Sequence, residues 1–153
     1  MSYFKWFDLP EDHNLDLNKL QEKYYALSKK MHPDNFQGKS ALEHQLAQQA
    51  LQLNHQAYQT LFCPIKRLSY ILLLNKIDLA SEEMQKQPFS ADFLEKIFEW
   101  QSNLNDKSTK VELENTVSEK LAQAIDLLKQ SNYESVVPLA REILFMNKIM
   151  EHS

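Results

Sequence analysis

The sequence predicts an all-α protein, and its composition and periodicity both point that way. The 153 residues include a single glycine, Gly38, and five prolines, whereas a sheet protein would need more turn glycines and more β-branched runs. Leu, Gln, Lys, Glu and Ala, which favour helices, are abundant. Several segments place apolar residues at steps of three and four, the period of a helix with one buried face. The length allows one domain or two small ones.

Residues 1–75 are expected to form a first domain built on a helical hairpin. Residues 2–9 predict a short helix or turn that ends at Pro10, and Asp16 is a plausible N-cap for the next helix. Ser40 and Glu43 form a possible capping box at the start of the helix after that. Helices over 17–31 and 40–61, joined by a short loop, would pack antiparallel to bury their apolar stripes. A further helix is expected from Pro64, since proline is tolerated in a first turn. The expected stripes are Leu17, Leu20, Tyr24, Leu27 and Met31 on one helix, and Leu42, Leu46, Ala50, Leu53, Ala57 and Leu61 on the other.

Residues 76–90 are expected to be a linker, because acidic residues, serines and Pro88 break the helical pattern there. Residues 91–153 then predict a second domain with helices over about 90–104, 112–130 and 134–150. Their short connections favour an up-down three-helix bundle.

The second domain carries more large apolar residues than its core needs. One face of the first predicted helix carries the core seam Phe93, Ile97, Trp100 and Leu104. Leu94 and Phe98 lie roughly 90° or more away on a helical wheel. Phe145 falls on the side of the last helix opposite to its core seam. Exposed apolar residues one turn apart suggest an interaction face. The alternative is that Leu94 and Phe98 pack on the first domain or widen the core.

The predicted hairpin places His32-Pro33-Asp34 at its tip. Pro33 cannot continue a helix and disfavours the α conformation at His32, so His32 and Asp34 are expected to face solvent. The preceding helix carries Lys19, Lys23 and Lys30 within about 40° of one another on a wheel. This pattern indicates either a docking loop with a basic flank, or a helix stop beside an ordinary solvated face.

Composition and charge exclude several classes of function. The net charge is −4, and no basic face of the size that nucleic acid requires is evident. The longest apolar run is too short to span a membrane. A single cysteine, Cys63, fits a reducing compartment, and the first residues lack the apolar core of a signal peptide, so a soluble cytoplasmic protein is expected.

No cofactor or metal site is expected. A hydrolase using His32 and Asp34 is a remaining alternative, although no pocket for catalysis is evident from the sequence.

These motifs together carry a resemblance to a known family. The chain resembles the J-domain co-chaperones, and most closely their HscB (Jac-type) branch, which serves iron-sulfur cluster assembly. The first half matches through Tyr3-Phe4, Phe7, Leu9-Pro10, the basic helix ending in His32-Pro33-Asp34-Asn35-Phe36, the run Asn54 to Leu61, and Pro64, Arg67, Tyr70 and Leu72-Leu73. The second half matches through Phe93-Leu94, Glu99-Trp100, Leu104, and Arg141 through Phe145 with Lys148.

The resemblance implies a fold and two binding surfaces. It implies an L-shaped protein with an N-terminal J domain and a C-terminal three-helix domain, with no enzyme activity of its own. The first surface would bind and stimulate a DnaK-like ATPase, HscA, through His32, Pro33, Asp34, Lys19, Lys23, Lys29 and Lys30. The second would bind the iron-sulfur scaffold protein IscU through Leu94, Glu95, Phe98, Glu99, Ser102 and Phe145. Glu95 stands where the family usually has methionine, and Ser102 where it usually has glutamate. A J-domain co-chaperone with a different client is the main alternative.

Overall fold

The computed structural model describes residues 1–152, and these residues form helices and connecting turns without a strand. The chain divides into two compact units, Met1–Leu74 and Asn75–Ser153. Ser153, the last residue of the expected second domain, lies outside the described residues. The all-α class predicted from composition and periodicity is confirmed.

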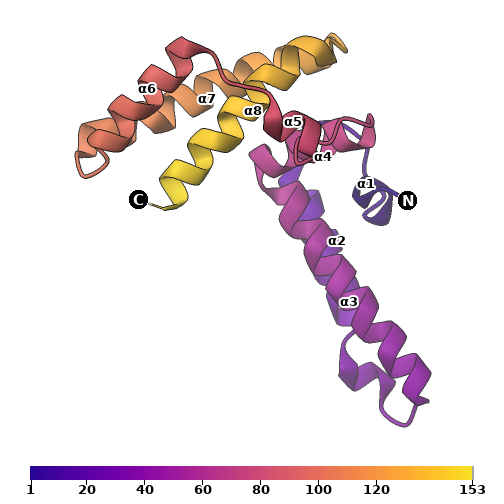
Figure 1. Cartoon of the computed structure of the whole chain (residues 1–153). Helices are drawn as coiled ribbons and strands as arrows, with labels where there is room; N and C mark the ends of the chain where they lie inside the picture. Colours follow the sequence, from indigo (N-terminus) through magenta and orange to yellow (C-terminus); the bar gives the residue numbers. More distant parts are fainter. Residues whose placement is uncertain (153) are drawn as a thin grey trace. The chain divides into compact units, whose positions relative to one another are not determined.

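The first unit is built on an antiparallel pair of helices (Figure 1). It contains α1 (Tyr3–Trp6), α2 (Leu17–Lys30), the 3₁₀ turn η1 (Pro33–Phe36), α3 (Ala41–Phe62) and α4 (Pro64–Leu74). Asp16 caps α2 by accepting hydrogen bonds from the amides of Asn18 and Lys19. Ser40 caps α3 by accepting from the amide of Glu43, and its hydroxyl donates to the Glu43 carboxylate. The predicted capping residues therefore set the start of both hairpin helices.

The apolar core of the first unit lies at the end of the hairpin where α1 and α4 join it, away from the loop. Phe4, Leu20, Leu61, Leu68 and Leu72 are fully or almost fully buried there. The far end of the hairpin consists of α2, α3 and η1 alone (Figure 1). It buries little apolar surface, because two helices can cover only one narrow stripe on each other.

This geometry corrects the predicted apolar stripes. Leu42 and Leu46 are exposed on α3, and Leu17 is exposed at the start of α2. The buried positions of α3 are Ala47, Asn54, Ala57 and Leu61. Ala57 and Leu61 are buried as predicted, whereas Ala47 and Asn54 lie outside the predicted stripe. Small alanines allow close approach of the two helices, so the face that packs is set by fit as well as by hydrophobicity.

A buried asparagine joins three helices of the first unit. Asn54 on α3 is fully buried, and its side-chain oxygen accepts a 2.9 Å hydrogen bond from the Trp6 indole of α1. Its amide nitrogen donates to the Tyr24 carbonyl at 3.1 Å and to the Ser28 hydroxyl at 3.0 Å, both on α2. All the donor and acceptor groups that it brings into the core thus have partners, as a buried amide requires.

Replacing Asn54 by leucine is expected to destabilise the first unit by about 2 kcal/mol, because the Trp6 indole would lose its acceptor and the hydrogen bonds that join α3 to α2 would be lost. The comparison variant is Gln52→Ala, on the exposed side of the same helix, which should change stability by less than about 0.5 kcal/mol. Urea unfolding followed by circular dichroism measures both. Equal stability of Asn54→Leu and wild type would show that the network contributes nothing.

Arg67 and His13 brace the base of the hairpin. The buried guanidinium of Arg67 donates to the carbonyls of His13 at 2.6 Å, Leu61 at 2.7 Å and Phe62 at 3.3 Å. The His13 ring lies 2.9 Å from the Pro64 carbonyl through Nε2, and burial lowers the pKa of His13 below its ordinary value. Burial also lowers the pKa of Arg67. The segment before α2 is thereby tied to the junction of α3 and α4.

The second unit contains the predicted three-helix bundle. It comprises α5 (Glu82–Lys86), α6 (Ala91–Ser102), α7 (Lys107–Lys129) and α8 (Tyr133–Glu151). Phe93, Ile97 and Trp100 of α6 are buried as predicted. Helix α7 begins five residues before the expected residue 112, because Asp106 caps it by accepting from the Ser108 amide.

The segment expected to be a linker has structure of its own. Within residues 76–90, α5 is capped by Ser81, and the segment falls within the second unit. The Arg141 side chain of α8 donates to the Gln87 carbonyl at 2.7 Å, and the ring of Phe89 lies 4.9 Å from that of Phe93. The acidic and serine-rich pattern signalled a break between long helices and gave no sign of these contacts.

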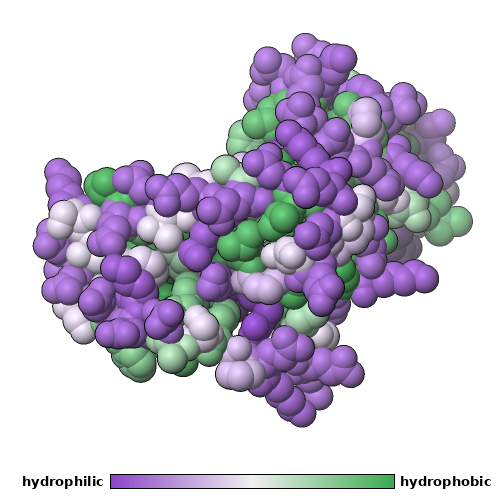
Figure 2. All heavy atoms as spheres, turned by 90° about the horizontal axis from the view of Figure 1, so that it is seen from above, coloured by the Kyte–Doolittle hydropathy of each residue, from purple (hydrophilic) through white to green (hydrophobic). Residues whose placement is uncertain are grey.

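Hydrophilic residues cover most of the molecular face drawn in Figure 2, with smaller hydrophobic areas between them. Within residues 1–152, no helix combines the length and apolar character that a membrane span requires.

Candidate functional site

The tip of the hairpin is a short turn held by local hydrogen bonds. The amide of His32 donates to the Lys29 carbonyl in the last turn of α2, and Pro33 occupies the first position of η1. His32 adopts an extended conformation with φ −62° and ψ 140°, as expected for a residue that precedes proline. The chain therefore leaves α2 sharply and re-enters a helical turn within three residues.

His32 and Asp34 are both presented to solvent, as the sequence predicts. The His32 side chain is 58% exposed and that of Asp34 is 78% exposed. His32 Nδ1 accepts the Asp34 backbone amide at 3.2 Å, which requires an imidazole whose Nδ1 carries no proton. The Asp34 carboxylate lies 3.5 Å from the same nitrogen. The imidazole thus acts as the N-cap of η1, and the Asp34 carboxylate remains accessible to an approaching donor.

Asn35 links the loop back to α2, which the sequence did not indicate. Its side-chain amide donates to the Lys29 carbonyl at 2.6 Å and to the Lys30 carbonyl at 3.2 Å. Asparagine is a common residue around helix ends, but only the folded chain shows that these carbonyls lie within its reach.

The four lysines of the predicted basic surface do not share one environment. Lys19, Lys29 and Lys30 are exposed on α2. Lys23 is only half-exposed, and its ammonium donates to the Asp8 carbonyl at 2.9 Å. Lys23 thus ties α2 to the turn after α1, a contact that no helical wheel reveals.

In the second unit, α6 presents an apolar pair flanked by acidic residues. Phe98 is 68% exposed and Leu94 is 39% exposed. Glu95 and Glu99 are exposed on the same helix. Asp92, Glu95, Lys96 and Glu99 line a shallow hollow of about 310 Å³. The described structure therefore leaves Leu94 and Phe98 uncovered by their own unit, which agrees with the helical-wheel prediction.

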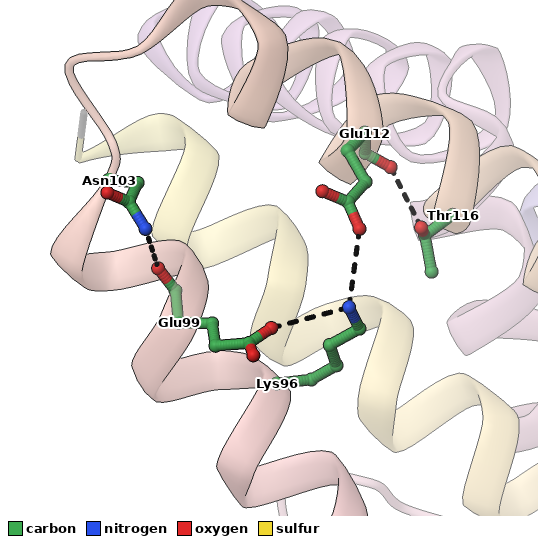
Figure 3. Close-up of polar contacts among 5 residues, drawn as sticks. All are labelled: Lys96, Glu99, Asn103, Glu112 and Thr116. Atoms are coloured by element: carbon green, nitrogen blue, oxygen red, sulfur yellow. Dashed lines mark hydrogen bonds and ion pairs between the residues drawn. The ribbon is translucent and has the colours of Figure 1, made fainter.

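Lys96 connects this helix to α7 (Figure 3). Its ammonium lies 3.4 Å from a Glu99 carboxylate oxygen and 3.4 Å from one of Glu112. The pKa of Lys96 is raised above its ordinary value, first by the hydrogen bond and charge of Glu99 and then by those of Glu112. The Asn103 amide donates to the Glu99 carbonyl in the last turn of α6. Lys96 thus pairs with one carboxylate on its own helix and one on α7, whereas Asn103 binds the backbone of Glu99.

Ser102 has its hydroxyl engaged within α6. Its Oγ donates to the Phe98 carbonyl one turn earlier, at 2.9 Å. The residue is exposed, so its hydroxyl oxygen can still accept a hydrogen bond from outside.

Phe145 does not point away from the core, which corrects the helical-wheel expectation. Its ring contacts Phe89 edge-on with a centroid distance of 5.3 Å and lies 6.3 Å from the ring of buried Phe93. The Arg141 guanidinium stacks 4.6 Å from the Phe89 ring centroid. The wheel failed here because the segment that follows α5 lies against this side of α8 and places Phe89 there. Phe145 is half-buried, so one part of its ring remains accessible.

Among residues 1–152, no group of three or more His, Cys, Asp or Glu side chains is placed to hold a metal ion.

Comparison with known proteins places the chain in a family. No protein-family model matches it. It is 31% identical over 157 residues to the co-chaperone protein HscB homolog of Mannheimia succiniciproducens, covering 96% of this chain and 90% of that protein. The chaperone HscB from Vibrio cholerae superposes with a TM-score of 0.85 and 27% identity, covering 99% of this chain and 94% of that one. The human co-chaperone protein HscB shares the fold, with a TM-score of 0.84 at 24% identity over 99% of this chain and 80% of its own. The exposed His-Pro-Asp turn, the helical bundle and these similarities lead to one conclusion: the chain belongs to the HscB family of J-domain co-chaperones.

Proposed function

We propose that this co-chaperone stimulates the ATPase of a DnaK-like chaperone, HscA, and delivers the iron-sulfur scaffold protein IscU to it in the cytoplasm. In this proposal, residues 1–75 act on the chaperone and residues 91–153 bind the client. The observation that carries it is the turn His32-Pro33-Asp34, held by local hydrogen bonds at the hairpin tip with its carboxylate exposed. Membership of the HscB family supports both activities.

The proposed chaperone surface works through position and charge. Lys19, Lys29 and Lys30 steer α2 towards an acidic surface of the ATPase, an attraction that weakens with salt. Asp34 then offers its carboxylate to an arginine of the partner in a charge-assisted hydrogen bond. Because the loop is already ordered, binding costs little conformational entropy. Lys23 contributes mainly by anchoring α2, since its ammonium is held by the Asp8 carbonyl.

The proposed client surface centres on Leu94 and Phe98. Exposed apolar side chains that lie together on a folded domain are suited to binding another protein, and large side chains of this kind carry most of the affinity at interfaces. Glu95, Glu99 and Ser102 form the polar surroundings, and the accessible part of Phe145 contributes from α8. Lys96 holds Glu99 in place for this contact.

Two measurements with purified proteins test the proposal. The wild-type chain should raise the ATP turnover of HscA at least about tenfold at saturation, and it should bind IscU in isothermal titration calorimetry. Stimulation without IscU binding would indicate a J-domain co-chaperone with a different client. Hydrolysis by the chain alone, with no ATPase present, would favour the hydrolase alternative and contradict the proposal.

A further inference from the structure

We propose that Asn35 is a positioning residue, whose amide holds the His32-Asp34 turn against the end of α2 in the conformation that the chaperone recognises. The expected effect of Asn35 on the loop follows from the described geometry. Its expected effect on the ATPase rests on the proposed function. Asn35 itself is not required to touch the partner.

The first argument is the pair of hydrogen bonds that Asn35 makes. Its Nδ2 lies 2.6 Å from the Lys29 carbonyl and 3.2 Å from the Lys30 carbonyl, the last two residues of α2. The final carbonyls of a helix lack the amide partner four residues on that interior carbonyls have, and they carry the negative end of the helix dipole. The Lys29 carbonyl accepts the His32 amide as well as the Asn35 side chain. An amide NH₂ group supplies two donors at one nitrogen, which suits two adjacent carbonyls. One side chain thus joins η1 to the helix before it.

The second argument is the position of Asn35 relative to Asp34. The Asn35 backbone amide donates to the His32 carbonyl at 3.0 Å, while the Asp34 amide donates to His32 Nδ1. The residue carrying the exposed carboxylate therefore lies between two residues that are both fixed. Releasing the Asn35 side chain frees one side of this turn and widens the range of directions open to the Asp34 carboxylate.

The third argument is that few buried contacts hold η1, which packs against α3 with Phe36 as its one partly buried side chain. His32, Asp34 and Asn35 are exposed, and η1 contains no buried residue. Hydrophobic burial therefore contributes little to the order of the turn, and local hydrogen bonds must supply it. The two hydrogen bonds of the Asn35 side chain therefore account for a large part of what keeps this turn ordered.

The experiment compares Asn35→Ala, which removes the donor, with Asn35→Asp, which keeps the shape but places a carboxylate against two carbonyls. Gln37→Ala, a neighbouring exposed position, is the matched control. Hydrogen exchange measured by NMR reports the order of residues 32–36 in the full chain without a partner. ATP turnover of HscA, titrated with each variant, gives the half-maximal concentration and the maximal rate.

Both Asn35 variants should accelerate amide exchange in the turn by about fivefold or more, while exchange in the core of the first unit stays unchanged. The half-maximal concentration should rise by about fivefold, because a smaller fraction of molecules presents the competent loop, and the maximal rate should be retained. Gln37→Ala should match wild type in both measurements.

Unchanged exchange in Asn35→Ala would overturn the inference, and so would faster exchange with an unchanged half-maximal concentration. A loss of thermal stability alone, without either change, would indicate a merely structural role and also overturn it. If the wild-type chain stimulates no ATPase, the proposed function fails instead. The exchange rates would then still accept or reject Asn35 as the residue that holds the loop.

Discussion

Replacing Asp34 by asparagine is expected to abolish stimulation of the HscA ATPase at concentrations where wild type is active, because the half-maximal concentration should rise by about thirtyfold or more. The substitution preserves the size of the side chain but removes the charge that Asp34 offers to the partner. Loss of one member of a desolvated charge pair at an interface costs about 2 to 5 kcal/mol, since the other charge is left buried without its partner. Steady-state ATP turnover, titrated with variant and wild type, measures the loss.

Asp34→Asn should leave the chain itself intact. The Asp34 side chain is exposed, and η1 is capped by His32 through the Asp34 backbone amide, which the substitution retains. Unfolding transitions should therefore coincide with those of wild type. The charge-matched control is Asp126→Asn, at an exposed position of α7 in the second unit, which should stimulate normally. Full stimulation by Asp34→Asn would contradict the role given to the carboxylate.

The double substitution Leu94→Ala/Phe98→Ala is expected to weaken IscU binding by about a hundredfold or more. Both side chains are exposed on α6 and lie one turn apart, so they can enter an apolar pocket of the client together. Truncation of a hot-spot residue at an interface costs about 2 kcal/mol or more, and Phe98, the larger and more exposed of the two, is the expected hot spot. Isothermal titration calorimetry with purified IscU measures the change in affinity, and the stability of the double variant should match wild type because its core is untouched.

Val111→Ala is the matched control for this experiment, since Val111 is a large apolar residue exposed on α7, outside the predicted client set. It should bind IscU as wild type does. Phe145 is less suitable for the first test, because its ring packs on Phe89 and Phe93 and its removal would also disturb the bundle. Equal binding by the double variant and wild type would remove α6 from the client surface.

Much of the fold could be predicted from local sequence, because capping and periodicity act over short distances. Asp16 and Ser40 start their helices as expected, and the seam Phe93, Ile97 and Trp100 is buried as expected. The errors arise where the burial of a helix face depends on packing by an element that is distant in the sequence. Leu42 and Leu46 have the right spacing for burial, but both remain exposed at the end of the hairpin that lies away from α1 and α4.

The site could be predicted in outline but not in its supporting contacts. Exposure of His32 and Asp34 follows from the effect of Pro33 on its neighbours, and exposure of Leu94 and Phe98 follows from the helical wheel. Three supporting contacts form between residues that only the folded chain brings together. They are the double hydrogen bond of Asn35, the hydrogen bond from Lys23 to the Asp8 carbonyl, and the stacking of Arg141 on Phe89. Spacing in the sequence carries no sign of such contacts.

The central claim is that one chain joins the chaperone loop to the client surface, and a mixing experiment tests it most directly. ATP turnover of HscA with IscU present is measured at a limiting concentration of wild type, and then with an equimolar mixture of Asp34→Asn and Leu94→Ala/Phe98→Ala. The account predicts that wild type raises turnover more than the mixture does, because tethering increases the effective concentration of the scaffold at the chaperone. Equal turnover from the mixture and from wild type would contradict it.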